Sequence, residues 1–231
     1  MNWIKFMDVI NSIDKSSIFV IDKSIAKTDY IQLDLSIDNE ELKKIDTSSS
    51  DELENYINDY ICYNKVKVAF GGYLETRNIY ARSKYFNEQL DSNDERNIHL
   101  GMDIWADINT NVLAALDGEI HSFNNNTNFG DYGPTIIMKH EVKNFIFYTL
   151  YGHLTLESLN DLKIGRIVKK GEVISQLGSP KVNGDYPSHL HFQIILDIQN
   201  YKGDYPGVCS KNDLTFYKKN CPDPNILLKI D

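Results

Sequence analysis

The sequence contains few cysteines and no long apolar run. Cys62, Cys209 and Cys221 are its only cysteines, and none of them forms a C-x-x-C pair. This pattern argues against a disulfide framework and against a thiolate zinc site, so we expect three reduced thiols. No run of about 18 apolar residues occurs, so no membrane span is expected.

The N-terminus also lacks the features of an export signal. Charged and polar residues interrupt every apolar run there, and neither an apolar h-region nor a small-residue cleavage site is present. We therefore expect the chain as written to be cytoplasmic. A periplasmic or secreted location would follow if the N-terminus had been trimmed.

Positive charge is also in short supply. The 231 residues include 24 lysines and arginines against 33 acidic residues, which gives a net charge of −9. This balance argues against nucleic acid as a partner and against an electrostatic grip on an anionic membrane. A cationic or neutral substrate remains open. Apolar residues make up 42% of the chain, enough for one sizeable domain or one domain with a smaller extension.

Residues 1–65 read as a small α+β extension. Apolar residues at helical spacing begin the chain, and short strands are predicted at residues 17–22 and 30–37. A polar stretch then precedes a helix that Asp51 could cap, with Glu54 three residues later. One face of this helix is apolar and predicts packing against the next domain: Leu53, Tyr56, Ile57, Tyr60 and Ile61.

Residues 66–231 read as a mainly β domain. Short strands separated by glycine-marked turns indicate an antiparallel sheet or sandwich. The expected strands cover residues 66–70, 112–116, 119–123, 135–140, 144–150, 167–168, 173–174 and 189–195. We expect the second and third of these to form a tight hairpin around Asp117-Gly118, and the tail from residue 200 to wrap the surface.

Metal-type residues gather in three short patches between His99 and His191. They are His99-Leu-Gly-Met-Asp103, Tyr151-Gly-His153 and His189-Leu-His191. In an extended strand His99 and Asp103 would stand about 13 Å apart, so sharing one ion requires a bend, which Gly101 permits. Residues two apart on a strand share a face, as His189 and His191 would.

Each patch alone has an ordinary structural explanation, because isolated histidines commonly satisfy local polar needs. We assign His121 and His140 to such a role. Together, however, the patches could supply two imidazoles and one carboxylate to a hydrolytic zinc ion with one position open for water. Two further imidazoles would remain to handle protons. The pattern therefore predicts a zinc hydrolase.

The three patches resemble the lysostaphin-like (LytM-type) zinc metalloendopeptidases in order and in separation, over about residues 66–200. The resemblance implies an antiparallel β core with a groove, Zn²⁺ as cofactor and cleavage of peptide bonds in cell-wall peptidoglycan. Carried over by position, it makes His99, Asp103 and His191 the zinc ligands. It makes His153 and His189 the catalytic pair that flanks the attacking water.

Three further segments are similar to a signal-less subset of this family that is found fused to aminotransferase-like proteins: residues 130–135, 203–207 and 221–225. Two alternatives to a wall hydrolase therefore stay open. One is an intracellular zinc hydrolase of a small amide or peptide conjugate, and the other is a non-catalytic LytM-like regulatory module. The complete ligand set favours an enzyme with a peptide or peptidoglycan substrate.

Overall fold

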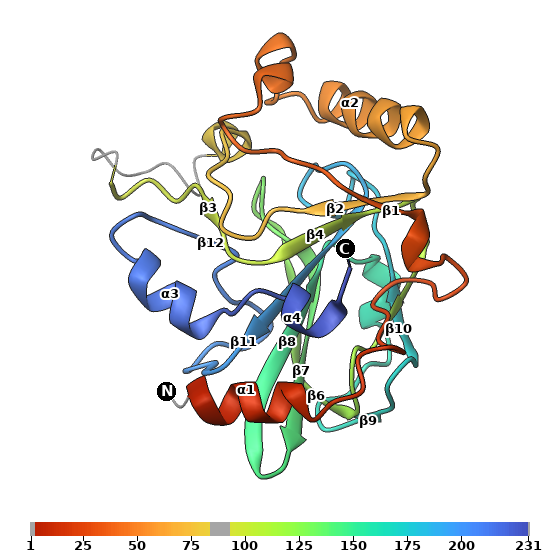
Figure 1. Cartoon of the computed structure of the whole chain (residues 1–231), viewed down its shortest axis with the longest axis vertical. Coiled ribbons are helices and arrows are strands. Elements are labelled where there is room, and N and C mark those ends of the chain that lie inside the picture. The colour runs from red at the N-terminus through yellow and green to blue at the C-terminus, as the bar shows by residue number, and fades with distance from the viewer. Residues whose placement is uncertain (1–2, 84–92, 231) are drawn as a thin grey trace.

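Short, alternating apolar strands assemble into one large sheet. The computed structural model describes residues 3–83 and 93–230. Figure 1 shows the sheet running through the middle of the molecule. Its strands, in spatial order, are β1 (Tyr30–Gln32), β2 (Val68–Gly71), β4 (Met102–Trp105), β11 (His189–Ile195), β8 (Phe145–Gly152), β7 (Gly133–Val142), β6 (Gly118–Asn126) and β9 (Ile167–Val168). All neighbours pair antiparallel except β1 and β2, which are parallel.

Two small strand pairs accompany the sheet. They join β3 (Ile98–His99) to β12 (Val208–Cys209), and β5 (Asn111–Leu113) to β10 (Val173–Gln176). The predicted hairpin between residues 112–116 and 119–123 is therefore wrong. The strands predicted at residues 135–140 and 144–150 do form, as β7 and β8, and they pair with each other. Asp117-Gly118 does turn the chain, but β5 finds its hydrogen-bonding partner in β10, more than 50 residues later in the chain.

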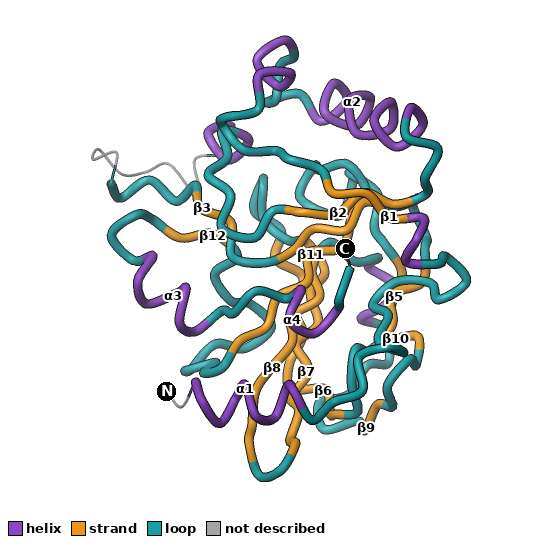
Figure 2. The backbone as a smooth tube through the Cα atoms, viewed as in Figure 1, coloured by secondary structure: helices purple, strands orange, loops and turns teal. Residues whose placement is uncertain are grey.

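Short helices lie on the outside of this framework (Figure 2). They are α1 (Trp3–Asn11), α2 (Ser50–Tyr63), α3 (Leu214–Asn220) and α4 (Asn225–Leu228), with 3₁₀ turns η1 (Lys27–Asp29), η2 (Glu40–Lys44), η3 (Ile79–Arg82) and η4 (Leu156–Leu159). Among the described residues, no helix is both long and apolar enough to cross a bilayer.

The N-terminal segment joins the sheet directly. Its strand β1 extends the sheet beside β2, and the apolar face of α2 packs Leu53 and Ile57 against Trp105 of β4. Residues 17–22 form no strand, since only Ile21 makes an isolated bridge, to Val112. The helix cap is Ser49 rather than Asp51, because Ser49 is the last extended residue and its hydroxyl accepts from the Glu52 amide at 3.3 Å.

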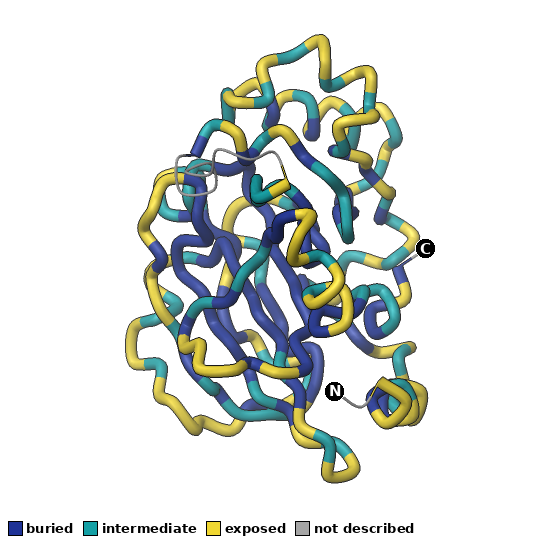
Figure 3. The backbone as a smooth tube through the Cα atoms, turned by 90° about the vertical axis from the view of Figure 1, so that its left-hand side faces the viewer, coloured by how far each residue is buried: buried dark blue, intermediate teal, exposed yellow. Residues whose placement is uncertain are grey.

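The two faces of β11 separate the core from the polar interior. One face of β11 places Leu190, Phe192 and Ile194 in the main apolar cluster. The residues that alternate with them are polar: His189, His191 and Gln193. Figure 3 shows that the central strands are buried along most of their length. The alternation holds a row of polar side chains inside the protein, where each must find a partner. All three cysteines are free, and only Cys62 is exposed.

His140 is a buried histidine with a structural role. Its Nδ1 atom lies 2.8 Å from the Asp117 carbonyl oxygen and its Nε2 atom lies 2.7 Å from the Thr149 hydroxyl. Burial lowers the pKa of His140 from 6.5 to about 4. The unfolded chain therefore binds more protons than the native protein between these pH values, and stability rises with pH across that window.

We predict that His140 lowers the free energy of unfolding by about 3 kcal/mol in total as the pH falls from about 6.5 toward 4. Urea denaturation at several pH values measures the slope. His140→Gln should flatten it, whereas His121→Gln, at a half-buried site, should flatten it less. Equal slopes in wild type and His140→Gln would contradict the assignment.

Candidate metal centre

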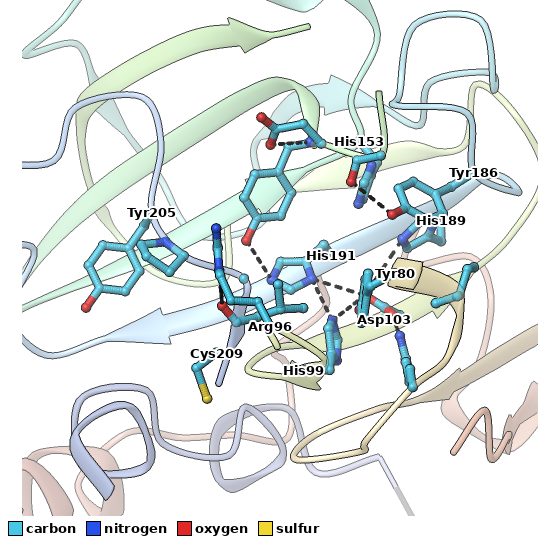
Figure 4. Close-up of a pocket in the computed structure, with 18 of the residues that line it drawn as sticks. Tyr80, Arg96, His99, Asp103, His153, Tyr186, His189, His191, Tyr205 and Cys209 are labelled. Atoms are coloured by element: carbon cyan, nitrogen blue, oxygen red, sulfur yellow. Dashed lines mark hydrogen bonds and ion pairs between the residues drawn. The ribbon is translucent and has the colours of Figure 1, made fainter. Parts of the chain in front are cut away.

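Strand register brings the predicted ligands together. On β11, His191 stands opposite Asp103 of β4 and opposite Gly152 at the end of β8. His99 ends β3, and the chain bends at Leu100-Gly101 before β4 begins. Because of this bend, His99 and Asp103 are not separated as they would be in an extended strand, and their side chains face the same point. Figure 4 shows His99, Asp103 and His191 converging inside the pocket.

Gly101 allows this convergence because it has no side chain. A Cβ atom on Gly101 would lie 2.6 Å from the His191 ring and 2.9 Å from the Phe192 carbonyl oxygen. Any larger residue would therefore push His191 away from Asp103. The sequence predicted a bend at this position, and the structure adds a close approach between the bend and β11.

The three donor atoms form a tight triangle. His99 Nε2 lies 2.9 Å from His191 Nδ1, and Asp103 Oδ1 lies 3.2 Å from each of these nitrogens. Three donors arranged tetrahedrally around a zinc ion lie about 3.3 Å from one another. Among the described residues, these three form the group of histidine, cysteine and acidic side chains that could hold a metal ion.

Hydrogen bonds on the outer sides of the rings fix both tautomers. His99 Nδ1 lies 2.9 Å from the Gly72 carbonyl oxygen and must donate to it. His191 Nε2 lies 2.9 Å from Gln193 Oε1, and the Gln193 amide nitrogen donates to the Pro206 carbonyl oxygen. The two inner nitrogens therefore carry lone pairs, as does Asp103 Oδ1. Three lone pairs that face one another repel without a cation, so the donor set fits a zinc ion.

Arg77 completes the surroundings of Asp103, and the sequence analysis did not find it. Its Nη1 donates to Asp103 Oδ2 at 2.5 Å and its Nε donates to Glu75 at 2.8 Å, while its side chain is 3% exposed. Arg77 thus occupies one carboxylate oxygen and leaves Oδ1 for the triangle. No motif marks Arg77, because its partners are distant in sequence or lie outside the histidine patches.

The pKa shifts follow from burial and from these charges. Burial lowers the pKa of His99 to about 4, so the ring is neutral at neutral pH. Burial disfavours charge on Asp103 too, but the Arg77 guanidinium holds the pKa of its carboxyl well below the ordinary value. His99 therefore offers a neutral imidazole and Asp103 an ionised carboxylate, the forms that metal binding requires.

His153 and His189 lie beside the triangle and contact each other. Their ring centroids are 4.1 Å apart, and His189 Nε2 lies 3.8 Å from Asp103 Oδ1. Each Nδ1 donates to a backbone carbonyl at 2.7 Å, that of Asn183 for His153 and that of Pro187 for His189. Burial lowers the pKa of both rings. Each therefore keeps one unprotonated Nε2 as a proton acceptor.

The backbone at His153 is unusual. Its φ of 63° is left-handed, which costs a non-glycine residue about 1–3 kcal/mol. Backbone hydrogen bonds hold it there, because its amide donates to Tyr132 and its carbonyl accepts from Gly178. This turn directs the residue after β8 toward His189 instead of continuing the strand.

Two tyrosines that the sequence analysis gave no role flank the histidines. The Tyr132 ring lies 5.0 Å from the His191 ring and 5.5 Å from the His153 ring. The Tyr186 ring lies 5.3 Å from His153 and 5.9 Å from His189. Together with the five predicted residues they line a cavity of about 330 Å³. Tyr132 lies in the segment 130–135 whose similarity was noted in the sequence, whereas no pattern marked Tyr186.

The remaining two histidines lie elsewhere. His140 is held by Asp117 and Thr149, and His121 by Ser122 and the Tyr148 ring. Neither lines the cavity. The structure thus brings the five predicted site residues together and leaves out the two that were assigned to structure.

Comparisons with known proteins point to peptidases. Residues 97–202, just under half of the chain, match the model of peptidase family M23. This match supports the predicted resemblance to lysostaphin-like peptidases, whereas the similarity to aminotransferase-fused proteins stays a prediction. No curated protein matches the chain.

Solved structures that match part of this chain include two peptidases and one further protein. The catalytic domain of lysostaphin from Staphylococcus simulans is 24% identical, with 53% of this chain and 80% of that domain covered and a TM-score of 0.37. A zinc-containing peptidase from Vibrio cholerae is 26% identical, with 48% and 32% covered and a TM-score of 0.35. Csd3 from Helicobacter pylori is 24% identical, with 54% and 33% covered and a TM-score of 0.35. The chain thus spans only about a third of the latter two.

A substitution of Gln193 tests whether the hydrogen bond to His191 Nε2 supports metal binding. Gln193→Leu removes the acceptor that fixes the His191 tautomer, and we expect zinc affinity to fall about 10- to 100-fold. Competition with a chromogenic chelator measures the dissociation constant. Gln176→Leu, an exposed substitution on β10, serves as the control. Unchanged affinity in Gln193→Leu would contradict the tautomer argument.

A substitution of Arg77 tests whether its positive charge stabilises the Asp103 and Glu75 carboxylates. Arg77→Met leaves the buried Asp103 carboxylate and the half-buried Glu75 carboxylate without their cation, and we expect the metal-free protein to lose about 3–5 kcal/mol of unfolding free energy. Urea denaturation in the presence of a chelator measures this loss. Arg166→Met, which removes an exposed ion pair with Glu172, should change stability by less than about 1 kcal/mol. A small effect at Arg77 would show that Asp103 is held by other groups.

Proposed function

We propose that this protein is a zinc-dependent peptidase. The observation that carries the proposal is the triangle of converging lone pairs on His99, Asp103 and His191, with two further neutral imidazoles beside it. The match of residues 97–202 to peptidase family M23 supports peptide bonds as the substrate. Cell-wall peptides and related glycine- or alanine-containing peptides are the substrate class we infer from the resemblance.

His99, Asp103 and His191 would hold the metal ion. A zinc ion in this position is a Lewis acid that activates water and polarises the scissile carbonyl. Asp103 contributes one oxygen, because Arg77 occupies the other. Gly72 and Gln193 keep both imidazoles in the ligating tautomer.

His153 and His189 would move the protons. Each presents an unprotonated Nε2, and each is oriented by a backbone carbonyl on its Nδ1 side. One ring accepts a proton from the attacking water, and its protonated form then stabilises the negative charge on the former carbonyl oxygen or donates to the leaving amine. Trp105 stacks on the His189 ring at 5.9 Å and limits the directions that ring can take.

The complete set of polar groups favours an enzyme over a non-catalytic module. A binding module would need neither the fixed tautomers nor the buried Arg77–Asp103 pair. Burying such groups is costly unless each is paired, and here the outer nitrogen of every site imidazole has a partner.

Two kinds of variant separate the roles. We expect His191→Ala to lose both bound zinc and peptidase activity, because one corner of the triangle is removed. We expect His153→Ala and His189→Ala to keep one zinc ion per chain while activity falls about 10²- to 10⁴-fold.

Elemental analysis gives the zinc content, and digestion of defined muropeptides followed by mass spectrometry gives the activity. His121→Ala is the matched control, since that ring lies outside the cavity. Retention of zinc and activity by His191→Ala would refute the ligand assignment. Full activity in both His153→Ala and His189→Ala would refute the proton-transfer roles.

A further inference from the structure

The metal centre is deeply enclosed. The five site residues are between 2% and 5% exposed, although a hydrolase must admit its substrate to them. The cavity above them measures about 330 Å³, at the lower end of the range for small-ligand sites, about 300–1,000 Å³. A site of this size suits a small ligand better than a polymer strand.

The N-terminal segment contributes to one wall of the cavity. Leu35 and Leu53 line the cavity together with Ile79 and Trp105, and we call these four residues the apolar wall. Leu35, Leu53 and Trp105 belong to one apolar cluster, and Trp105 stacks on His189. The apolar wall therefore stands beside the catalytic pair. Leu35, Leu53 and Ile79 lie outside the segment that matches peptidase family M23.

A set of polar contacts fastens this wall to the site. Ser50, the first residue of α2, donates to Asp185 at 3.0 Å, and Arg82 pairs with the same carboxylate at 3.1 Å. The Arg82 guanidinium also lies 4.5 Å from the Tyr186 ring centroid. Tyr186 in turn contacts both catalytic imidazoles. The start of α2 is thus tied to the loop that carries Tyr186.

The opposite wall comes from the C-terminal tail. Strand β12 pairs with the strand of His99, and the Gly207 carbonyl accepts from the Leu100 amide at 2.8 Å. Gly207 approaches Tyr132 so closely that a Cβ atom there would lie 1.8 Å from the tyrosine hydroxyl. Figure 4 shows Tyr205 and Cys209 on one side of His191, with Tyr186 and His189 on the other.

We propose that these two walls restrict the enzyme to short peptides with an apolar side chain beside His189, and that Leu35 and Leu53 are specificity-determining residues. The inference rests on the proposed peptidase function. A cross-linked polymer would have to reach past both walls to site residues that are at most 5% exposed, whereas a short peptide is closer in size to the 330 Å³ cavity. Within the inferred substrate class, this favours small, detached peptides over intact wall material.

Two substrates of different length test the restriction. One is a capped Ala-Leu-Ala tripeptide, and the other carries the same three residues with long alanine–lysine flanks on both sides. We expect kcat/KM of the zinc-loaded protein to be at least about tenfold higher for the tripeptide. Equal values would overturn the inference.

Variants of the apolar wall test whether it causes the preference for the short substrate. Leu53→Ala and Leu35→Ala widen the apolar wall, so the ratio between the short and the long substrate should fall several-fold. Leu42→Ala is the matched control, because Leu42 packs in the same apolar cluster but does not line the cavity. A ratio that changes equally in Leu42→Ala and Leu53→Ala would show that general loosening, and not the wall, controls access.

A binding measurement separates this inference from the proposed function. Hydroxamates of the two peptides are titrated into the cobalt-loaded protein, and the visible absorption of cobalt reports their dissociation constants. We expect the short hydroxamate to bind at least about tenfold more tightly in the wild type and the difference to shrink in Leu53→Ala. Selective binding without any peptide hydrolysis would refute the peptidase but keep the size restriction. Equal binding of both hydroxamates would refute the restriction whatever the activity.

Discussion

The convergence of three lone pairs on one point is the constraint on which the rest of the site depends. The pairing of β4 with β11 sets Asp103 opposite His191, and the bend before β4 adds His99. Each outer nitrogen is engaged elsewhere, by the Gly72 carbonyl or by Gln193, so no proton is available to relieve the repulsion between the inner atoms. A divalent cation relieves it, and the sheet holds the donors close to the spacing that such a cation needs.

Burial of the three donors has a free-energy cost that other groups must offset. Asp103 is 2% exposed, and an ionised carboxylate at such a position requires compensation by an opposite charge or by hydrogen bonds. Arg77 supplies it from the segment between β2 and β3, and by binding one carboxylate oxygen it also decides which oxygen faces the imidazoles. The same residue therefore serves stability and ligand geometry. Glu75 shares the arginine and ties the segment before β3 to the site.

The segments on either side of the family match give the site its particular shape. Residues 97–202 contain all five predicted site residues, but Arg77, the apolar wall residues Leu35 and Leu53, and the tail strand β12 lie outside that range. The predicted ligands thus lie inside the family match, whereas most of the apolar wall and the tail strand lie outside it. A metal centre of one type can in this way serve different substrates, because the enclosing segments can change while the ligand geometry stays fixed.

The sequence by itself determined the candidate donor set, the mainly β character and the strands β7, β8 and β11, because residue type and period-two alternation are local properties. It also pointed to the bend at Gly101. Only the tertiary structure decided the pairing of β5 with β10, the parallel pairing of β1, the left-handed turn at His153 and the roles of Arg77, Gln193 and Tyr132. These features depend on contacts between residues that are mostly far apart in the chain. The local periodicity of a sequence does not predict which distant group will pair with a buried charge or hydrogen-bond donor.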